Sequence, residues 1–188
     1  MDKREQILQA TAALIAEHGL QNCPMAKVAQ SAGCGAGTIY RYFETKEDLF
    51  KELFLNLYAK LEQRCLCDLS HCSSIKEQFF CFWGHFYNFM LENPTDMALL
   101  EQLRVYPGID EMLRERATTK MHQAVHELLE LGRQNGEIKP VHDDLLITMT
   151  FGSLLNLAKQ SHLAHELDHT PCLAGVLEMC WDAISVHA

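Results

Sequence analysis

Four soft metal ligands fall within one short stretch of this chain: Cys65, Cys67, His71 and Cys72. Thiols and imidazoles in that number match the ligands of a tetrahedral zinc site. The spacing is unfavourable, because Cys-x-Cys followed by adjacent His and Cys lacks the gaps that let a chain wrap around one ion. Three thiols near a helix end could instead sense oxidants, if one has a depressed pKa. We predict reduced loop cysteines with no metal and no cofactor, and keep metal binding and oxidant sensing as alternatives.

Aromatic side chains recur at helical spacing between residues 79 and 90. A stripe of this kind is usually core, but it can also line a pocket for a flat or apolar ligand, because such pockets are mostly apolar with a few polar groups. Both interpretations stay open. The candidate ligand-binding residues, from this stripe and from later helices, are Phe82, Trp83, Phe86, Tyr87, Met90, Leu103, Arg104, Met121, His122 and Phe151.

Catalytic motifs are absent from the sequence. There is no nucleophile elbow, no phosphate-binding glycine loop and no His-Glu-x-x-His pair. We therefore predict that the protein is not an enzyme.

The stretch from Val28 to Lys46 predicts a helix, a sharp turn and a second short helix. Apolar residues between positions 25 and 32 share one helical face, and Gly33 supplies a positive φ that ends the helix. Ile39, Tyr40 and Phe43 then repeat the spacing of three to four residues. Two short helices joined by a tight turn with glycine are typical of a helix-turn-helix, whose second helix enters the DNA major groove.

Further motifs extend this pattern from Lys3 to about Phe54. In order and without a gap they are Ile7-Leu8, Leu14-Ile15, Glu17-His18-Gly19, Val28-Ala29, Ala32-Gly33, Gly37-Thr38-Ile39-Tyr40, Tyr42-Phe43 and Lys46-Glu47-Asp48-Leu49. This stretch resembles the N-terminal DNA-binding domain of the TetR/AcrR (tetracycline-repressor) family of bacterial transcriptional regulators. The rest of the chain resembles that family only in its helical layout.

The resemblance implies an all-α fold with two domains. Residues 1–46 would form a three-helix helix-turn-helix DNA-binding domain, and residues 47–188 a larger helical domain for ligand binding and dimerisation. The implied function is a homodimeric regulator, most simply a repressor that leaves a palindromic operator when a small apolar or aromatic effector binds. The alternative is a helical ligand- or metal-binding protein, or an enzyme, that uses the Cys65/Cys67/His71/Cys72 cluster or an aromatic pocket without acting on DNA.

The resemblance also assigns residues to DNA. The positions that grip phosphates in the family are occupied by Thr38, Tyr42 and Lys46, and all three offer suitable donors. The positions near base edges are Gly35, Ala36, Gly37, Tyr40 and Arg41, of which Arg41 can bind guanine O6 and N7 together. Many relatives carry a polar or basic residue near Ala36, so readout here would depend on Arg41, thymine methyl contact and DNA shape. Tyr40 could equally pack inside the domain.

Lys3 and Arg4 begin the first predicted helix. Positive charge there opposes the helix dipole, so the pair is explained by contact with phosphate or by ordinary solvation. Residues 1 to 51 hold six basic and six acidic side chains, and the remaining ten basic and nineteen acidic residues carry the whole net charge of -9. DNA contact should therefore be confined to the N-terminal domain, because the acidic remainder repels phosphates.

Apolar periodicity predicts further helices along the chain. Thr45 and Asp48 form a capping-box-like start for a long fourth helix, and the later helices are expected over residues 75–91, 93–105, 110–135, 143–166 and 171–186. The last two are more apolar than a one-sided surface helix, and the resemblance implies that they pair with their copies in a homodimer. No apolar run approaches the roughly 18 residues of a membrane helix, and there is no signal-peptide core, so we expect a cytoplasmic protein with no membrane contact.

Overall fold

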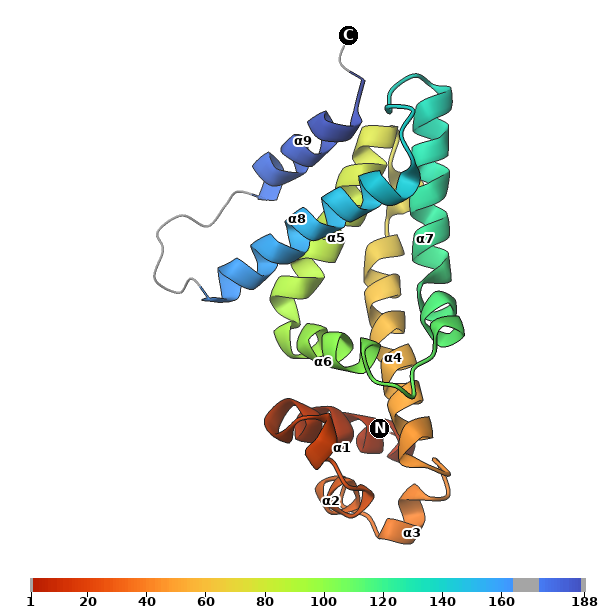
Figure 1. Cartoon of the computed structure of the whole chain (residues 1–188), viewed down its shortest axis with the longest axis vertical. Helices are drawn as coiled ribbons and strands as arrows, with labels where there is room; N and C mark the ends of the chain where they lie inside the picture. Colours follow the sequence, from red (N-terminus) through yellow and green to blue (C-terminus); the bar gives the residue numbers. More distant parts are fainter. Residues whose placement is uncertain (1, 164–172, 187–188) are drawn as a thin grey trace. The chain divides into compact units, whose positions relative to one another are not determined.

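The computed structural model describes residues 2–163 and 173–186, and the regular elements within those ranges are helical apart from one isolated antiparallel bridge between Ile138 and Ser185 (Figure 1). The elements in chain order are α1 (Lys3–His18), η1 (Leu20–Asn22), α2 (Met25–Ser31), α3 (Ala36–Ile39), α4 (Lys46–Leu66), η2 (Leu69–His71), α5 (Ile75–Glu92), α6 (Pro94–Arg104), α7 (Glu111–Gln134), α8 (Asp143–Leu163) and α9 (Leu173–Ile184). The predicted all-α fold is confirmed. The predicted ends of the last two helices at residues 166 and 171 lie outside the described residues.

Side-chain caps explain why the helices begin where the sequence predicted. Thr45 Oγ1 accepts a hydrogen bond from the Asp48 backbone N–H at 3.0 Å, and Asp48 Oδ2 accepts one from the Thr45 backbone N–H at 3.1 Å. This reciprocal pair confirms the predicted capping box at the start of α4. Ser74 caps α5 in the same position, through a bond of 3.2 Å from the Glu77 N–H.

Contacts divide the chain into two compact units. Unit 1 contains the residues up to Lys60 together with Thr95–Thr118, and unit 2 contains Leu61–Pro94 together with the residues from Thr119 onwards. Helices α4 and α7 therefore each contribute residues to both units. The predicted boundary between residues 46 and 47 stays a prediction, since it falls just after the first residue of α4 and does not coincide with the division between these units.

The core of unit 1 includes side chains from α1, α2, α3 and the first part of α4. Its fully buried side chains include Ile7, Ile15, Val28, Ile39 and Leu49. These are the apolar positions of the helical pattern in the sequence, so burial of one face of each short helix accounts for the fold of the N-terminal region.

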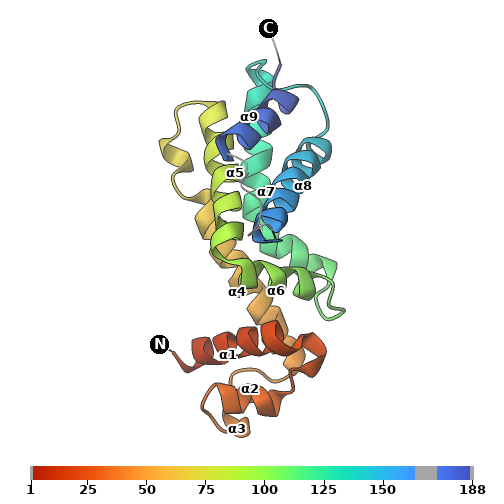
Figure 2. The same cartoon turned by 90° about the vertical axis from the view of Figure 1, so that its left-hand side faces the viewer.

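The core of unit 2 is centred on α5, which contacts both α8 and α9 (Figures 1 and 2). Phe79 on α5 meets Trp181 on α9 edge to face, with ring centroids 5.5 Å apart. Gly132 on α7 faces Ile138, whose Cδ1 atom would lie only 2.5 Å from a Cβ at that position. A side chain at position 132 would therefore require Ile138 to shift. Within the described ranges, no helix is long and apolar enough to cross a membrane.

Candidate nucleic-acid interface

The turn between α2 and α3 has the geometry of a glycine-terminated helix end. Gly33 has φ +60°, as its position in the sequence predicted. Its N–H bonds to the Gln30 carbonyl at 3.1 Å, and the Cys34 N–H bonds to the Ala29 carbonyl at 2.9 Å. This pair of hydrogen bonds is the Schellman motif, which satisfies the last carbonyls of α2 and turns the chain directly into α3.

Residues 35–42, called here the recognition segment, are held by buried anchors. Ile39 within the segment is fully buried and Phe43 just after it is 3% exposed. Tyr40, which could have packed inside, is 53% exposed, and Tyr42 is 42% exposed. The predicted DNA-contacting residues of the segment that face solvent are Gly35, Ala36, Gly37, Tyr40, Arg41 and Tyr42, while Thr38 is half-buried.

The four basic side chains predicted to contact DNA differ in what they bind within the protein. Arg4 forms an ion pair of 2.7 Å with Glu52, and Lys3 donates to the Gln6 side-chain oxygen at 2.6 Å.

Lys46 donates to the Leu20 carbonyl at 3.2 Å and lies over the Phe50 ring, and it forms no ion pair with the residues that the structure describes. Arg41 is exposed, and in the part of the chain that the structure describes it forms no side-chain hydrogen bond or ion pair. Its five donors therefore all remain available to an external partner.

Two family models match the chain: bacterial regulatory proteins of the tetR family over residues 7–53, and a tetracyclin repressor-like C-terminal domain over residues 74–185. The chain belongs to the TetR family. It is therefore a DNA-binding, helix-turn-helix transcriptional regulator, as the sequence predicted. This membership favours a regulator over the alternative of a helical ligand- or metal-binding protein that does not act on DNA.

Individual members of the TetR family align along most of the chain. A TetR-family transcriptional regulator from Vibrio parahaemolyticus is 33% identical, with 99% of this chain and 100% of that chain covered and a TM-score of 0.80. An uncharacterised HTH-type transcriptional regulator of Haemophilus influenzae is 27% identical over 184 residues, covering 97% of this chain and 96% of the relative. The fold also matches FadR of Bacillus subtilis, solved in complex with stearoyl-CoA, at 23% identity, 97% and 99% coverage and a TM-score of 0.79.

The predicted effector residues differ in burial and are divided between the two units. Those on α5 are buried, as is Met121 on α7, whereas His122 is exposed. Phe151 on α8 is half-buried, with its ring centroid 5.4 Å from that of Phe86. Leu103 and Arg104 belong to unit 1, so unit 2 contains only the other eight: Phe82, Trp83, Phe86, Tyr87, Met90, Met121, His122 and Phe151.

A surface depression lies elsewhere in unit 2. It is lined by Lys76, Glu137, Trp181 and Asp182 among others, and contains none of the predicted effector residues.

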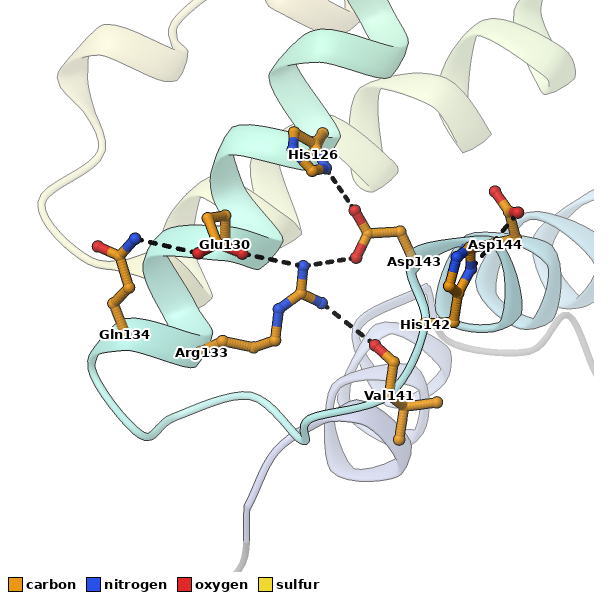
Figure 3. Close-up of polar contacts among 8 residues, drawn as sticks. All are labelled: His126, Glu130, Arg133, Gln134, Val141, His142, Asp143 and Asp144. Carbon is orange, nitrogen blue, oxygen red and sulfur yellow. Dashed lines mark hydrogen bonds and ion pairs between the residues drawn. The ribbon is translucent and has the colours of Figure 1, made fainter.

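Sequence reasoning missed an ion-pair network at the junction of α7 and α8 (Figure 3). Arg133 lies 2.6 Å from one Asp143 carboxylate oxygen, and His126 Nδ1 lies 2.5 Å from the other. Arg133 also donates to the Val141 carbonyl at 3.2 Å and pairs with Glu130 at 3.3 Å. Burial works to raise the pKa of Asp143, but the hydrogen bonds from His126 and Arg133 outweigh it and lower that pKa.

The structure does not bring the four candidate ligands Cys65, Cys67, His71 and Cys72 together as one group, and Cys65 lies in α4 instead of in the predicted loop. Cys65 is fully buried, and burial raises its pKa to about 12, whereas the His71 side chain is 82% exposed.

Cys67 instead meets two residues of α5. Its Sγ lies 3.4 Å from His85 Nδ1, and the Cys81 Sγ lies 3.7 Å from the same nitrogen. The signal in the sequence was Cys81-x-x-x-His85, which places both side chains on one helical face.

Proposed function

We propose that this regulator acts as a homodimeric repressor on a palindromic operator in the cytoplasm, without catalysing a reaction, and that Arg41 reads a base edge in each half-site. The observation that carries this proposal is the exposed, unpaired guanidinium of Arg41 on a segment anchored by Ile39 and Phe43. A planar fork of donors held on a rigid element suits bidentate binding of guanine in the major groove.

Phosphate contacts are assigned to the residues around Arg41. Tyr42 offers an exposed phenol and Thr38 a half-buried hydroxyl, each a hydrogen-bond donor to phosphate oxygens. Lys46 adds a charge that its bond to the Leu20 carbonyl orients without neutralising. Lys3 and Arg4 have partners within the protein, so they contribute less to DNA binding. Arg4 must break its ion pair with Glu52 before it can contact a phosphate.

The proposed dimer interface is formed by α8 and α9 of each protomer. These helices contact each other and carry apolar side chains on the surface: Leu145 is 60% exposed, Met149 39% and Met179 73%. Burial of such side chains against a second copy contributes about 25 cal/mol per Å² of apolar surface. Leu145→Glu should therefore shift the protein from dimer to monomer in size-exclusion chromatography with light scattering, while Val105→Glu, at a more exposed apolar residue in unit 1, should not.

The proposed effector is a small apolar or aromatic molecule that binds among the α5 side chains of unit 2. Support comes from the concentration of aromatic rings there, with Trp83 and Phe86 5.8 Å apart between centroids. Further support comes from the fold neighbour FadR of Bacillus subtilis, which was solved in complex with stearoyl-CoA. Ligand binding releases DNA only if it favours the form with the lower operator affinity, so effector and operator must weaken each other by the same factor.

The test begins with operator fragments recovered by a genomic pull-down and uses fluorescence anisotropy. Arg41→Ala should lose discrimination at one base pair per half-site, by about 1 to 3 kcal/mol. Arg116→Ala, an exposed arginine elsewhere in unit 1, is the matched control and should bind like the parent protein. Equal specificity of the Arg41 variant and the control would overturn the assignment of base reading to Arg41.

The effector is tested by titration with stearoyl-CoA and with uncharged aromatic compounds, with and without operator. Affinity should differ by a factor of about 5 to 150 between the two titrations. Phe86→Leu should lower the affinity for the ligand. Phe80→Leu, which changes a half-buried α5 residue outside the predicted set, should leave that affinity unchanged. Leucine is chosen because replacing a buried phenylalanine by alanine costs about 3–5 kcal/mol of stability. Identical ligand affinity with and without operator would rule out effector-driven release.

A further inference from the structure

Two thiols approach the same nitrogen of an imidazole in unit 2. Cys67 Sγ and Cys81 Sγ lie 3.4 Å and 3.7 Å from His85 Nδ1. In a tetrahedral zinc site, zinc–sulfur bonds of about 2.3 Å and zinc–nitrogen bonds of about 2.0 Å place the ligand sulfur and nitrogen about 3.6 Å apart. The two observed separations lie on either side of that distance.

A carboxylate lies close to two of these three donors, Cys67 and His85, while Cys81 is outside that group of mutually close ligand atoms. One oxygen of Asp68, Cys67 Sγ and a ring nitrogen of His85 all lie within 4.8 Å of one another. Asp68 has φ +65°, and it is the one residue other than glycine with positive φ in the described ranges. This left-handed conformation turns the chain directly after α4, so that Asp68 and Cys67 lie beside α5.

We infer that Cys67, Asp68, Cys81 and His85 bind a single Zn²⁺ ion. The donor set of two sulfurs, one nitrogen and one oxygen suits this ion, because zinc accepts thiolate, imidazole and carboxylate ligands in tetrahedral geometry. The assignment differs from the prediction of no metal, which considered Cys65 and His71 and did not pair Cys67 with residues of α5. It is also independent of the proposed effector, which binds elsewhere on α5.

Charge supports a cation at this position. Two thiolates and a carboxylate would carry three negative charges, which a divalent cation and the Arg64 guanidinium, 3.6 Å from Cys67 Sγ, would neutralise together. Burial, the neighbouring Cys72 and Cys67 thiols and Asp68 raise the pKa of Cys81 to about 11. A bound cation opposes that effect, because it stabilises the thiolate and displaces its proton.

A metal requires the neutral form of the imidazole. Burial, together with the positive charge of Arg64, lowers the pKa of His85, which favours that form. A neutral ring can present an unprotonated Nδ1 to the ion. The site would tie the residues that follow α4 to the middle of α5.

The experiment uses the full-length protein, reduced and freed of metal, and titrates it with Zn²⁺ against a chromophoric chelator. One Zn²⁺ should bind per chain. Cys67→Ser, Cys81→Ser and His85→Gln should each weaken binding by more than about tenfold, since even residues behind the ligands change metal affinity by about 10- to 100-fold. Cys34→Ser and His122→Gln are the matched controls and should leave the affinity unchanged.

Cobalt substitution identifies the ligands separately from affinity. Co²⁺ bound by thiolates absorbs in the near ultraviolet, so Cys67→Ser and Cys81→Ser should each remove about half of that band in cobalt-saturated protein. Asp68→Asn should weaken binding but keep the band. Circular dichroism checks that each variant is folded. Substoichiometric Zn²⁺ in the reduced parent protein, or equal affinities in the ligand variants and the controls, would overturn the assignment.

Discussion

Arg41 and Arg133 differ in whether their guanidinium groups are paired within the protein. Arg133, at the α7–α8 junction of unit 2, binds Asp143, Glu130 and the Val141 carbonyl (Figure 3). Arg41 is exposed and forms none of these contacts within the described residues. A guanidinium with satisfied donors stabilises the fold, whereas one left open on a rigid segment can bind an external anion or base. The pairing state of an arginine thus separates structural from recognition residues.

Salt concentration should produce the largest difference between the two regions, because it should affect operator binding much more than the stability of unit 2. If the dimer neutralises about 6 to 10 phosphates, operator affinity should fall by about 10³ to 10⁵ between 50 mM and 200 mM salt. The Arg133–Asp143 pair is less screened, because its two side chains are only 19% and 18% exposed. Unfolding of unit 2 should therefore change little over the same range.

Operator affinity by anisotropy and urea unfolding by tryptophan fluorescence measure the two effects in the same buffers. Both tryptophans, Trp83 and Trp181, belong to unit 2, so the fluorescence reports that unit. Operator affinity that is independent of salt would contradict the proposed phosphate contacts.

Loss of Lys46 should weaken DNA binding without changing sequence preference. Lys46→Ala removes a phosphate contact in each protomer, so all DNA sequences should be bound more weakly, with a salt slope smaller by about 2 for the dimer. Lys120→Ala, an exposed lysine of unit 2 paired with Glu62, is the control. A change of base preference in Lys46→Ala would show that this side chain does more than neutralise phosphate.

Much of this architecture could be predicted from sequence because its signals are local. Apolar periodicity and the Thr45–Asp48 capping box fixed the helix limits to within a few residues where the structure describes them. Gly33 was predictable for the same reason, since a helix end needs a residue that tolerates positive φ. Sites formed by distant residues were not predictable.

Two sites show why the rest could not be predicted. Cys67 lies beside His85 of α5, where the chain turns at Asp68 with a left-handed backbone conformation that apolar periodicity does not predict. Arg133 reaches Asp143 across a loop whose path depends on the bridge at Ile138. Periodicity locates the helices, but it does not say how their ends approach each other.

Arg133→Ala should show the opposite behaviour to Arg41→Ala. It leaves Asp143, which is largely buried, without its guanidinium partner, and a lost hydrogen bond to a charged group costs about 1.5–3 kcal/mol. The urea midpoint followed by tryptophan fluorescence should fall, while base discrimination by folded protein stays unchanged. Arg41→Ala should leave the midpoint unchanged. If both variants lowered the midpoint equally, pairing state would not distinguish the two arginines.

Acid should produce the smallest effect, and its direction follows from Asp143. Hydrogen bonds from His126 and Arg133 overcome the opposing effect of burial and hold the pKa of this carboxyl below its ordinary value of 3.8. A carboxyl with a lowered pKa in the folded state adds stability that is complete above the ordinary value and is lost as the pH falls through the folded pKa.

Asp143→Asn should therefore be less stable than the parent protein at pH 7 and pH 5, by about 1 kcal/mol. The gap should begin to narrow near pH 3.8 and close as the pH falls through the lower folded pKa, where the parent carboxyl becomes protonated and loses its charge. Asp144→Asn is the control, since that neighbour is 88% exposed and is paired with His142 alone among the described residues. A gap between parent and Asp143→Asn that persisted unchanged at pH 3 would mean that the carboxylate charge does not hold the α7–α8 junction, and that the contacts of Arg133 with Glu130 and Val141 are sufficient.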